Sequence, residues 1–202
     1  RLSTQVLQKT KHGFIAERFV QFKRELAASF VRGRAGEFLQ LPLVESVQVD
    51  SRCFSVAGPV SHRGLKKLAA QVKTMMEATG YVGILAVEMF DTPKGLLVNE
   101  LAPRVHNSAH YSQDALTCSQ FEYHLRAGLG LPLPKLKLMD KAFAMVNLLG
   151  EGNSEIRLSR GTHGHLHWYG KNENRPGRKL GHINVTATTV KKALAEALKW
   201  RK

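Results

Sequence analysis

The sequence predicts an α+β protein, and two periodicities carry this prediction. Short apolar runs of strand length recur along the 202 residues, and three longer segments repeat apolar residues at the three- and four-residue steps of a helix. Because 43% of the residues are hydrophobic, the chain can bury a sizeable core as one large domain or two small ones. Prolines at 132 and 134 predict a linker within a break near residues 130–140.

The elements before residue 80 follow from these patterns. Residues 1–12 are polar and predict a short helix, whereas residues 56–59 predict irregular structure. Residues 62–79 predict the first long helix, and Gly80 ends it. The strands expected in this part lie at 14–22, 24–31 and 38–49, the last interrupted by Pro42.

Two apolar strands follow, at 83–90 and from Leu96 onward, and each carries one acidic residue. Beyond them, helices are expected at 119–129, closed by Gly130, and at 190–200. The remaining strands are expected at 142–149, 164–169 and 181–186.

Net charge and cysteine content limit the class of protein. The chain carries 30 Lys and Arg against 16 Asp and Glu, a formal charge of +14, which favours anionic partners. No nucleic-acid motif or aromatic–basic repeat is present, so small phosphorylated ligands suit the charge as well as nucleic acid does. No apolar run is long enough to span a membrane. The two distant cysteines, Cys53 and Cys118, indicate reduced thiols and a cytoplasmic location.

The acidic hairpin is the most informative segment. A three-residue loop, Pro93-Lys94-Gly95, would pair Thr92 with Leu96 and Phe90 with Val98, and would place Glu88 directly opposite Glu100. Like charges so placed repel each other, and a divalent cation with oxygen ligands would turn the pair into a binding site. A surface hairpin whose glutamates face water is the alternative.

Four other groups of residues could carry chemistry. Arg104, His106 and Asn107 share one loop after Pro103 and could hold a small anion, or they could only tie the loop down. Glu17 and Glu25 flank a bend, where exposed glutamates are ordinary.

Four cations, Lys171, Arg175, Arg178 and Lys179, surround a Pro-Gly turn and could bind a phosphate or form a solvated loop. His163, His165 and His167 alternate, so they would share one face of a strand. A transition metal is the less favoured explanation, because no Asp, Glu or Cys ligand lies nearby in sequence.

Taken together, these residues resemble the 5-(carboxyamino)imidazole ribonucleotide synthetases, ATP-grasp enzymes of purine biosynthesis, over nearly the whole chain. The most specific segments are Gly80-Tyr-Val-Gly-Ile-Leu-Ala-Val-Glu88, Leu97-Val-Asn-Glu-Leu-Ala-Pro-Arg-Val-His-Asn-Ser108, Ser119-Gln-Phe-Glu122, and His165-Leu-His-Trp-Tyr-Gly-Lys171 with Arg175-Pro-Gly-Arg-Lys179 and Gly181-His182.

The resemblance implies an antiparallel ATP-grasp sheet with helices in residues 1–135, and a small β-rich C-terminal domain in residues 136–202. It implies a reaction in which ATP phosphorylates bicarbonate to carboxyphosphate, and aminoimidazole ribonucleotide then takes up the carboxyl group. ATP and Mg²⁺ would be the cofactors, and the intact enzyme is expected to be a homodimer.

The resemblance also implies roles for individual residues. Glu17, Arg18, Phe19 and Val20 would meet adenine, and Glu25 would bind the ribose hydroxyls. Glu88 and Glu100 would hold Mg²⁺ beside Asn99. Arg104, His106 and Asn107 would line the bicarbonate site, and Lys171, Arg175, Arg178 and Lys179 would grip the ribonucleotide phosphate.

Some features depart from the family pattern. Gln48 stands where the family usually has a nucleotide-contacting His, Ser46 replaces a usual Asn, and residues 50–53 differ from the usual Asp-Gly-Ile-Leu. The family's N-terminal domain, nucleotide-binding lysine and Gly-rich lid would precede Arg1, so we expect the isolated chain to lack synthetase activity. A formate-dependent glycinamide ribonucleotide transformylase and a non-catalytic binding module are the alternatives.

Overall fold

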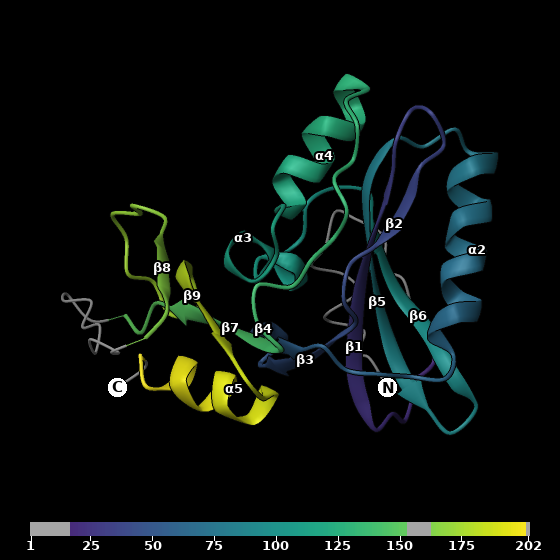
Figure 1. Ribbon diagram of the computed structural model, residues 1–202. Coiled ribbons are helices and arrows are strands. Elements are labelled where there is room, and N and C mark those ends of the chain that lie inside the picture. Colours follow the sequence, from purple (N-terminus) through teal and green to yellow (C-terminus); the bar gives the residue numbers. More distant parts are fainter. Residues whose placement is uncertain (1–16, 153–162, 201–202) are drawn as a thin grey trace, which may run out of the picture.

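The computed structural model describes residues 17–152 and 163–200, which form one sheet with helices packed on it (Figure 1). The predicted helix at 1–12 lies outside these residues. Nine strands are hydrogen-bonded in the order β6-β5-β1-β3-β4-β7-β9-β8, with β2 beside β1. Every pairing is antiparallel, so the predicted α+β class and antiparallel sheet are confirmed.

The strands are β1 (Arg24–Arg32), β2 (Phe38–Gln40), β3 (Val44–Val49), β4 (Arg52–Gly58), β5 (Gly83–Thr92), β6 (Gly95–Ala102), β7 (Ala142–Leu149), β8 (His165–Trp168) and β9 (Lys179–Ala187). The helices are α2 (Leu65–Ala78), the 3₁₀ turn η1 (Asn107–Ala109), α3 (Ser112–Ala115), α4 (Gln120–Leu129) and α5 (Val190–Leu198). No helix in the described part of the chain is long and apolar enough to cross a membrane.

Helix α2 covers one face of β1 and β5, where it lies along the sheet in Figure 1. Its buried side chains, Leu68, Val72 and Met76, recur every four residues, as the sequence predicts. Burying each of them contributes about 2 kcal/mol. The opposite face of the same strands packs in part against α4, through Val31 and Ile84, and the polar side chains described below lie further along it.

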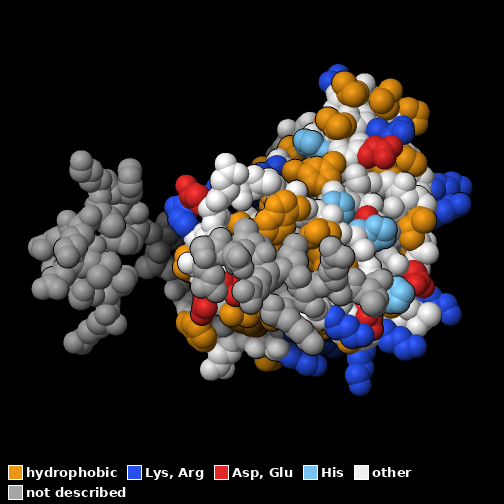
Figure 2. Space-filling model, turned by 90° about the vertical axis from the view of Figure 1, so that its left-hand side faces the viewer, with side chains coloured by type: hydrophobic (Ala, Val, Ile, Leu, Met, Phe, Trp, Pro, Cys, Tyr) orange, Lys and Arg blue, Asp and Glu red, His pale blue; other side chains and the backbone are white. Residues whose placement is uncertain are grey.

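Helix α4 packs through a different stripe from the apolar one in its sequence. Ser119 caps its N-terminus and Gly130 ends it in the left-handed conformation at φ 71°. The buried residues are Gln120, Tyr123 and Ala127. The apolar residues Leu125 and Leu129 are exposed instead, and Figure 2 shows hydrophobic side chains at the upper end of the molecule, where α4 ends.

Two predicted segments differ from the structure. Residues 17–22, the described part of the predicted strand at 14–22, have no regular structure. Among the described strands, β1 pairs with β2, β3 and β5, and none of them pairs with residues 17–22. Residues 56–58, predicted to be irregular, belong to β4. The small residues of β4 hid this strand; Gly58, for example, fits closely against the side chains of Phe143 and Val44.

Strand β7 connects the two parts of the chain that flank the predicted linker. It pairs with β4 on one side and with β9 on the other, while α5 packs on β7 and β9 through Ala193 and Ala197. One sheet therefore runs through both parts. The division into domains at residues 135 and 136 stays a prediction.

Three β-bulges interrupt the sheet formed by the described strands, and each lies beside candidate site residues. The extra residues are Asn99 on β6, Phe54 on β4 and Leu180 on β9. A bulge changes which face the following side chains occupy. The bulge at Leu180 thus puts Lys179 on the same face as His182, although the two residues are three apart.

Candidate active site

The two carboxylates of the acidic hairpin lie directly opposite each other. Glu88 on β5 pairs with Glu100 on β6, as the sequence predicts. Burial, then the charges of Glu100 and Glu25, raise the pKa of the Glu88 carboxyl. A cation would remove this repulsion, so the donor set fits a hard ion such as Mg²⁺.

The turn of this hairpin differs from the prediction. Thr92 pairs with Gly95 rather than Leu96, and Phe90 with Leu97 rather than Val98, which leaves a two-residue turn in place of three. The extra residue Asn99 then restores the predicted pairing of the glutamates.

Glu25 and Gln48 lie on the same face of the sheet as Glu88. Glu25 pairs with Ser46 of β3, and Ala27, two residues further along β1, pairs with Glu88. Burial raises the pKa of Glu25, whereas a hydrogen bond from Gln48 lowers it. The Gln48 amide also donates to Ser46 Oγ at 3.0 Å. The structure therefore groups three carboxylates and one amide, which suits a ligand with hydroxyls and a bound cation.

The loop after β6 brings an imidazole to the acidic pair. Nδ1 of His106 lies 3.7 Å from Oε1 of Glu88 and 2.9 Å from Ser108 Oγ. Burial, then the charges of Arg104 and Lys179, lower the pKa of His106, while Glu100 raises it. The ring is thus a neutral group at the edge of a charged site.

The predicted phosphate clamp meets this loop through one of its four cations. The Lys179 ammonium donates to Oδ1 of Asn107. Lys171 lies 5.7 Å from the ring centroid of Tyr169. Arg175 and Arg178 both pair with the carboxylate of Glu173, at 2.8 and 2.5 Å. An anionic ligand could therefore bind Lys179 without displacing a carboxylate. To bind the two arginines, it would have to compete with Glu173.

A fifth cation, Arg52, lies at this clamp and was not predicted from the sequence. Arg52 begins β4, and its guanidinium packs so closely on Gly177 that a Cβ there would collide with it. Residues Asp50 and Ser51, both with positive φ, form the tight turn that brings Arg52 back toward the clamp. A lone arginine after a turn gives no sequence signal of this contact.

The alternating histidines find an acidic partner that is distant in sequence. Nε2 of His167 lies 2.7 Å from Oδ2 of Asp114, and Nδ1 of His165 lies 3.5 Å from Oδ1. Asp114 also accepts from Asn184 at 2.6 Å. In the described ranges, no group of three or more His, Cys, Asp or Glu side chains is arranged to hold a metal. Asp114 was missed because it lies more than 50 residues upstream, on α3.

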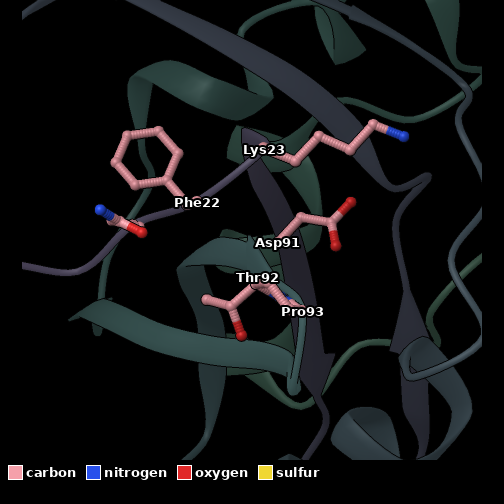
Figure 3. Close-up of a pocket in the computed structure, with 6 residues that line it drawn as sticks. Phe22, Lys23, Asp91, Thr92 and Pro93 are labelled. Carbon is pink, nitrogen blue, oxygen red and sulfur yellow. The ribbon is translucent and has the colours of Figure 1, made fainter.

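The segment predicted to meet adenine lies apart from the carboxylates. Arg18, Phe19 and Val20 line an open pocket of about 590 Å³ together with the β5–β6 turn, and the Phe19 side chain is 84% exposed. Glu17 is exposed as well. The neighbouring pocket in Figure 3 is lined by Phe22, Lys23 and the same turn, and Phe22 stacks on Phe90 with ring centroids 4.5 Å apart.

Comparison with known proteins identifies the family. The model of the ATP-grasp domain matches residues 2–121. The chain belongs to the ATP-grasp family. A second family model, the phosphoribosylaminoimidazole carboxylase C-terminal domain, matches residues 144–196 of this ATP-grasp chain.

Several relatives of this ATP-grasp chain carry the same name. The N5-carboxyaminoimidazole ribonucleotide synthase of Vibrio vulnificus (strain YJ016) is 44% identical over 172 residues, which are 85% of the chain and 45% of that protein. The structure of the synthetase from Thermus thermophilus superposes with a TM-score of 0.78 at 41% identity, covering 90% of the chain and 52% of that structure.

A third relative carries ligands. The synthase from Aspergillus clavatus, in complex with ADP and 5-aminoimidazole ribonucleotide, gives a TM-score of 0.80 at 34% identity, over 88% of the chain and 50% of that structure. The chain spans about half the length of the relatives that it matches.

Proposed function

We propose that the chain supplies the metal, bicarbonate and ribonucleotide-phosphate sites of an N5-carboxyaminoimidazole ribonucleotide synthetase. The reaction would be the ATP-dependent carboxylation of 5-aminoimidazole ribonucleotide with bicarbonate. One observation carries the proposal most: the His106–Asn107 loop connects the acidic pair to the basic clamp. His106 lies 3.7 Å from Glu88, and Asn107 accepts from Lys179.

This arrangement suits phosphoryl transfer followed by carboxyl transfer. Glu88 and Glu100, with Asn99 beside them, would hold Mg²⁺, which supplies charge neutralisation at the ATP phosphates when it is bound. Arg104, His106 and Asn107 would hold bicarbonate and the carboxyphosphate formed from it. Because burial lowers its pKa, the His106 imidazole is unprotonated at neutral pH and would act as a proton acceptor beside the bound anion.

The other predicted contacts complete the proposal. Glu25 and Gln48 would face the ribose of ATP, and the Glu17–Val20 segment would face its adenine. Lys171, Arg175, Arg178 and Lys179, together with Arg52, would bind the ribonucleotide phosphate as charge-assisted donors. Relatives whose names state this activity, and the ligands named in the Aspergillus clavatus structure, support the assignment. We further propose a homodimer in the cytoplasm for the intact enzyme.

The test is ADP release by the full-length natural protein. We expect release to require both bicarbonate and 5-aminoimidazole ribonucleotide, and to be negligible with formate and glycinamide ribonucleotide. The reverse preference would replace the proposal with the transformylase alternative. ATP turnover by residues 1–202 alone would contradict the expectation that this chain needs further segments for catalysis.

A further inference from the structure

Gln120 belongs to the Ser119-Gln-Phe-Glu122 motif, to which the proposed reaction gives no role. It is the first residue of α4, and its side chain is completely buried. A buried amide that makes no hydrogen bonds destabilises the fold, so the partners of this amide indicate why a glutamine is present at this position.

The Gln120 amide binds both backbone groups of His106. Its Oε1 accepts from the His106 N–H at 2.9 Å, and its Nε2 donates to the His106 carbonyl at 2.9 Å. The His106 N–H can only donate, so it fixes the orientation of the amide. The Gln120 amide thus binds the N–H and the carbonyl of one residue, as a neighbouring strand does in an antiparallel sheet.

The remaining polar groups of Gln120 bind the same segment of chain. Nε2 also donates to Nδ1 of His110 at 2.8 Å, and the backbone N–H of Gln120 donates to Ser112 Oγ at 2.8 Å. Ser112 Oγ in turn donates to the carbonyl of Ala109 at 2.6 Å. The start of α4 therefore holds the whole run from His106 to Ser112.

The position of the His106 backbone sets the position of its ring. Ser108 binds Nδ1 from within the same loop, so the loop turns as one unit, and the ring faces Glu88 only while its backbone stays in place. Asn107, the next residue, meets Lys179 from the other side. Displacing this loop by about 1 Å would separate the reacting groups, and errors of that size cost about a hundredfold in rate.

We propose that Gln120 is a positioning residue, whose side-chain amide fixes the His106 backbone and so holds His106 and Asn107 between the acidic pair and Lys179. Its effect on catalysis rests on the proposed function, whereas its effect on the loop does not. Two substitutions separate these effects. Gln120→Met keeps the length of the side chain and removes every polar atom. Gln120→Glu keeps both an O–H donor and an acceptor only when its carboxyl is protonated.

The experiment measures amide hydrogen exchange at His106, and kcat and KM for ATP, in the full-length natural protein. Gln113→Met is the matched control, because the Gln113 amide also contacts an imidazole, His167 at 3.3 Å, but not the loop. For Gln120→Met we expect exchange at His106 to become roughly tenfold faster or more, and kcat to fall about thirtyfold. KM for ATP should change less than about twofold, since the proposed adenine and ribose contacts lie elsewhere.

Gln120→Glu should show a deficit in kcat, relative to wild type, that shrinks as the pH falls from about 8 to about 6, because a buried carboxyl is protonated in that range. The deficit of Gln120→Met should stay constant. Unchanged exchange at His106 in both variants would overturn the proposal. So would a normal kcat in a Gln120→Met protein that merely unfolds at lower temperature. A wild-type protein that is inactive with bicarbonate, but whose variants exchange faster at His106, would refute the proposed function and retain the positioning role.

Discussion

Lys179 donates a hydrogen bond to Oδ1 of Asn107, and this bond joins β9 to a loop 72 residues earlier in the sequence. Burial, with a smaller contribution from Lys171, lowers the pKa of Lys179, and Cys53 opposes them. A neutral amide does not compensate the charge of a half-buried ammonium as a carboxylate would. The bond therefore marks a position where an anionic ligand would bind strongly.

Replacing this lysine tests the anion site. Lys179→Met should weaken binding of 5-aminoimidazole ribonucleotide to the full-length protein about tenfold or more, because it removes a charge-assisted contact worth roughly 1.5–3 kcal/mol. Isothermal titration calorimetry measures the change. Lys191→Met, the same substitution at an exposed residue of α5, is the control. Equal affinities of the two variants would exclude Lys179 from the site.

Neutralising one carboxylate tests the metal site. Glu88→Gln should stabilise the ligand-free protein by on the order of 1 kcal/mol at neutral pH, because burial and then the repulsion from Glu100 and Glu25, which raise the pKa of Glu88, act only on a charged carboxylate. The same variant should lose the rise in unfolding temperature that Mg²⁺ with ADP gives the wild-type protein. Glu77→Gln, on the exposed surface of α2, should leave the response to Mg²⁺ unchanged and should alter stability by no more than about 0.5 kcal/mol, since it removes only a surface ion pair with Lys73. A full response of Glu88→Gln to Mg²⁺ would assign the ion to other residues.

The stacked imidazoles predict how stability depends on pH. Burial lowers the pKa of both His110 and His182 from 6.5 to about 3, and their ring centroids are 5.0 Å apart. Their folded-state pKa values lie below the unfolded ones, so their stabilisation is complete above about pH 6.5 and is lost as the pH falls toward 3. Between about pH 7.5 and 5, each should cost on the order of 1–2 kcal/mol of unfolding free energy.

Urea unfolding at several pH values measures this dependence. The ionisable groups facing the pair are His106, His167, Lys179 and Tyr169, so the variant must change only one ring. His182→Phe preserves the stack and should remove about half of the loss between pH 7.5 and 5. The exposed His163→Phe is the control and should leave the slope unchanged. An unaltered slope in His182→Phe would place the pH dependence elsewhere.

Alanine substitutions at two glycines distinguish the contribution of Arg52 to ligand binding from the effect of backbone strain. Gly177 and Gly170 have φ values of 72° and 63°, but only a Cβ at Gly177 would meet Arg52, since nothing lies within 4 Å of one at Gly170. Both alanine variants should lose about 1 kcal/mol of stability. Only Gly177→Ala should also weaken binding of the ribonucleotide phosphate, by about threefold to tenfold, because it displaces the guanidinium. Equal affinities would show that Arg52 does not contact the ligand.

Much of the fold could be predicted because it follows from local periodicity. The helical spacing of Leu68, Val72 and Met76 gave α2, and glycines at 80 and 130 marked the ends of two helices. The opposed pair Glu88 and Glu100 was also predicted, but from a three-residue loop; the two-residue turn and the extra residue Asn99 produce the same pairing.

What the sequence missed depends on contacts between distant segments. The pairing of His167 with Asp114, the packing of Arg52 on Gly177 and the binding of His106 by Gln120 each require the folded sheet. Strand β4 was missed in part because small residues suffice where bulky neighbours fill the space. Phe19 shows the opposite error, since its apolar run suggested a strand, but residues 17–22 pair with no strand in the described part of the chain.

Because of the bulge at Asn99, the pairing of Glu88 with Glu100 does not depend on the length of the hairpin turn alone. A hairpin with a three-residue loop and no bulge, and this hairpin with a two-residue turn and one extra residue, deliver the same pair of glutamates. One residue can thus belong either to the turn or to a bulge in the strand, and the pairing of the two carboxylates is the same in both cases. The tip is therefore free to vary in length as the surface requires, while the carboxylates further along the two strands keep their geometry.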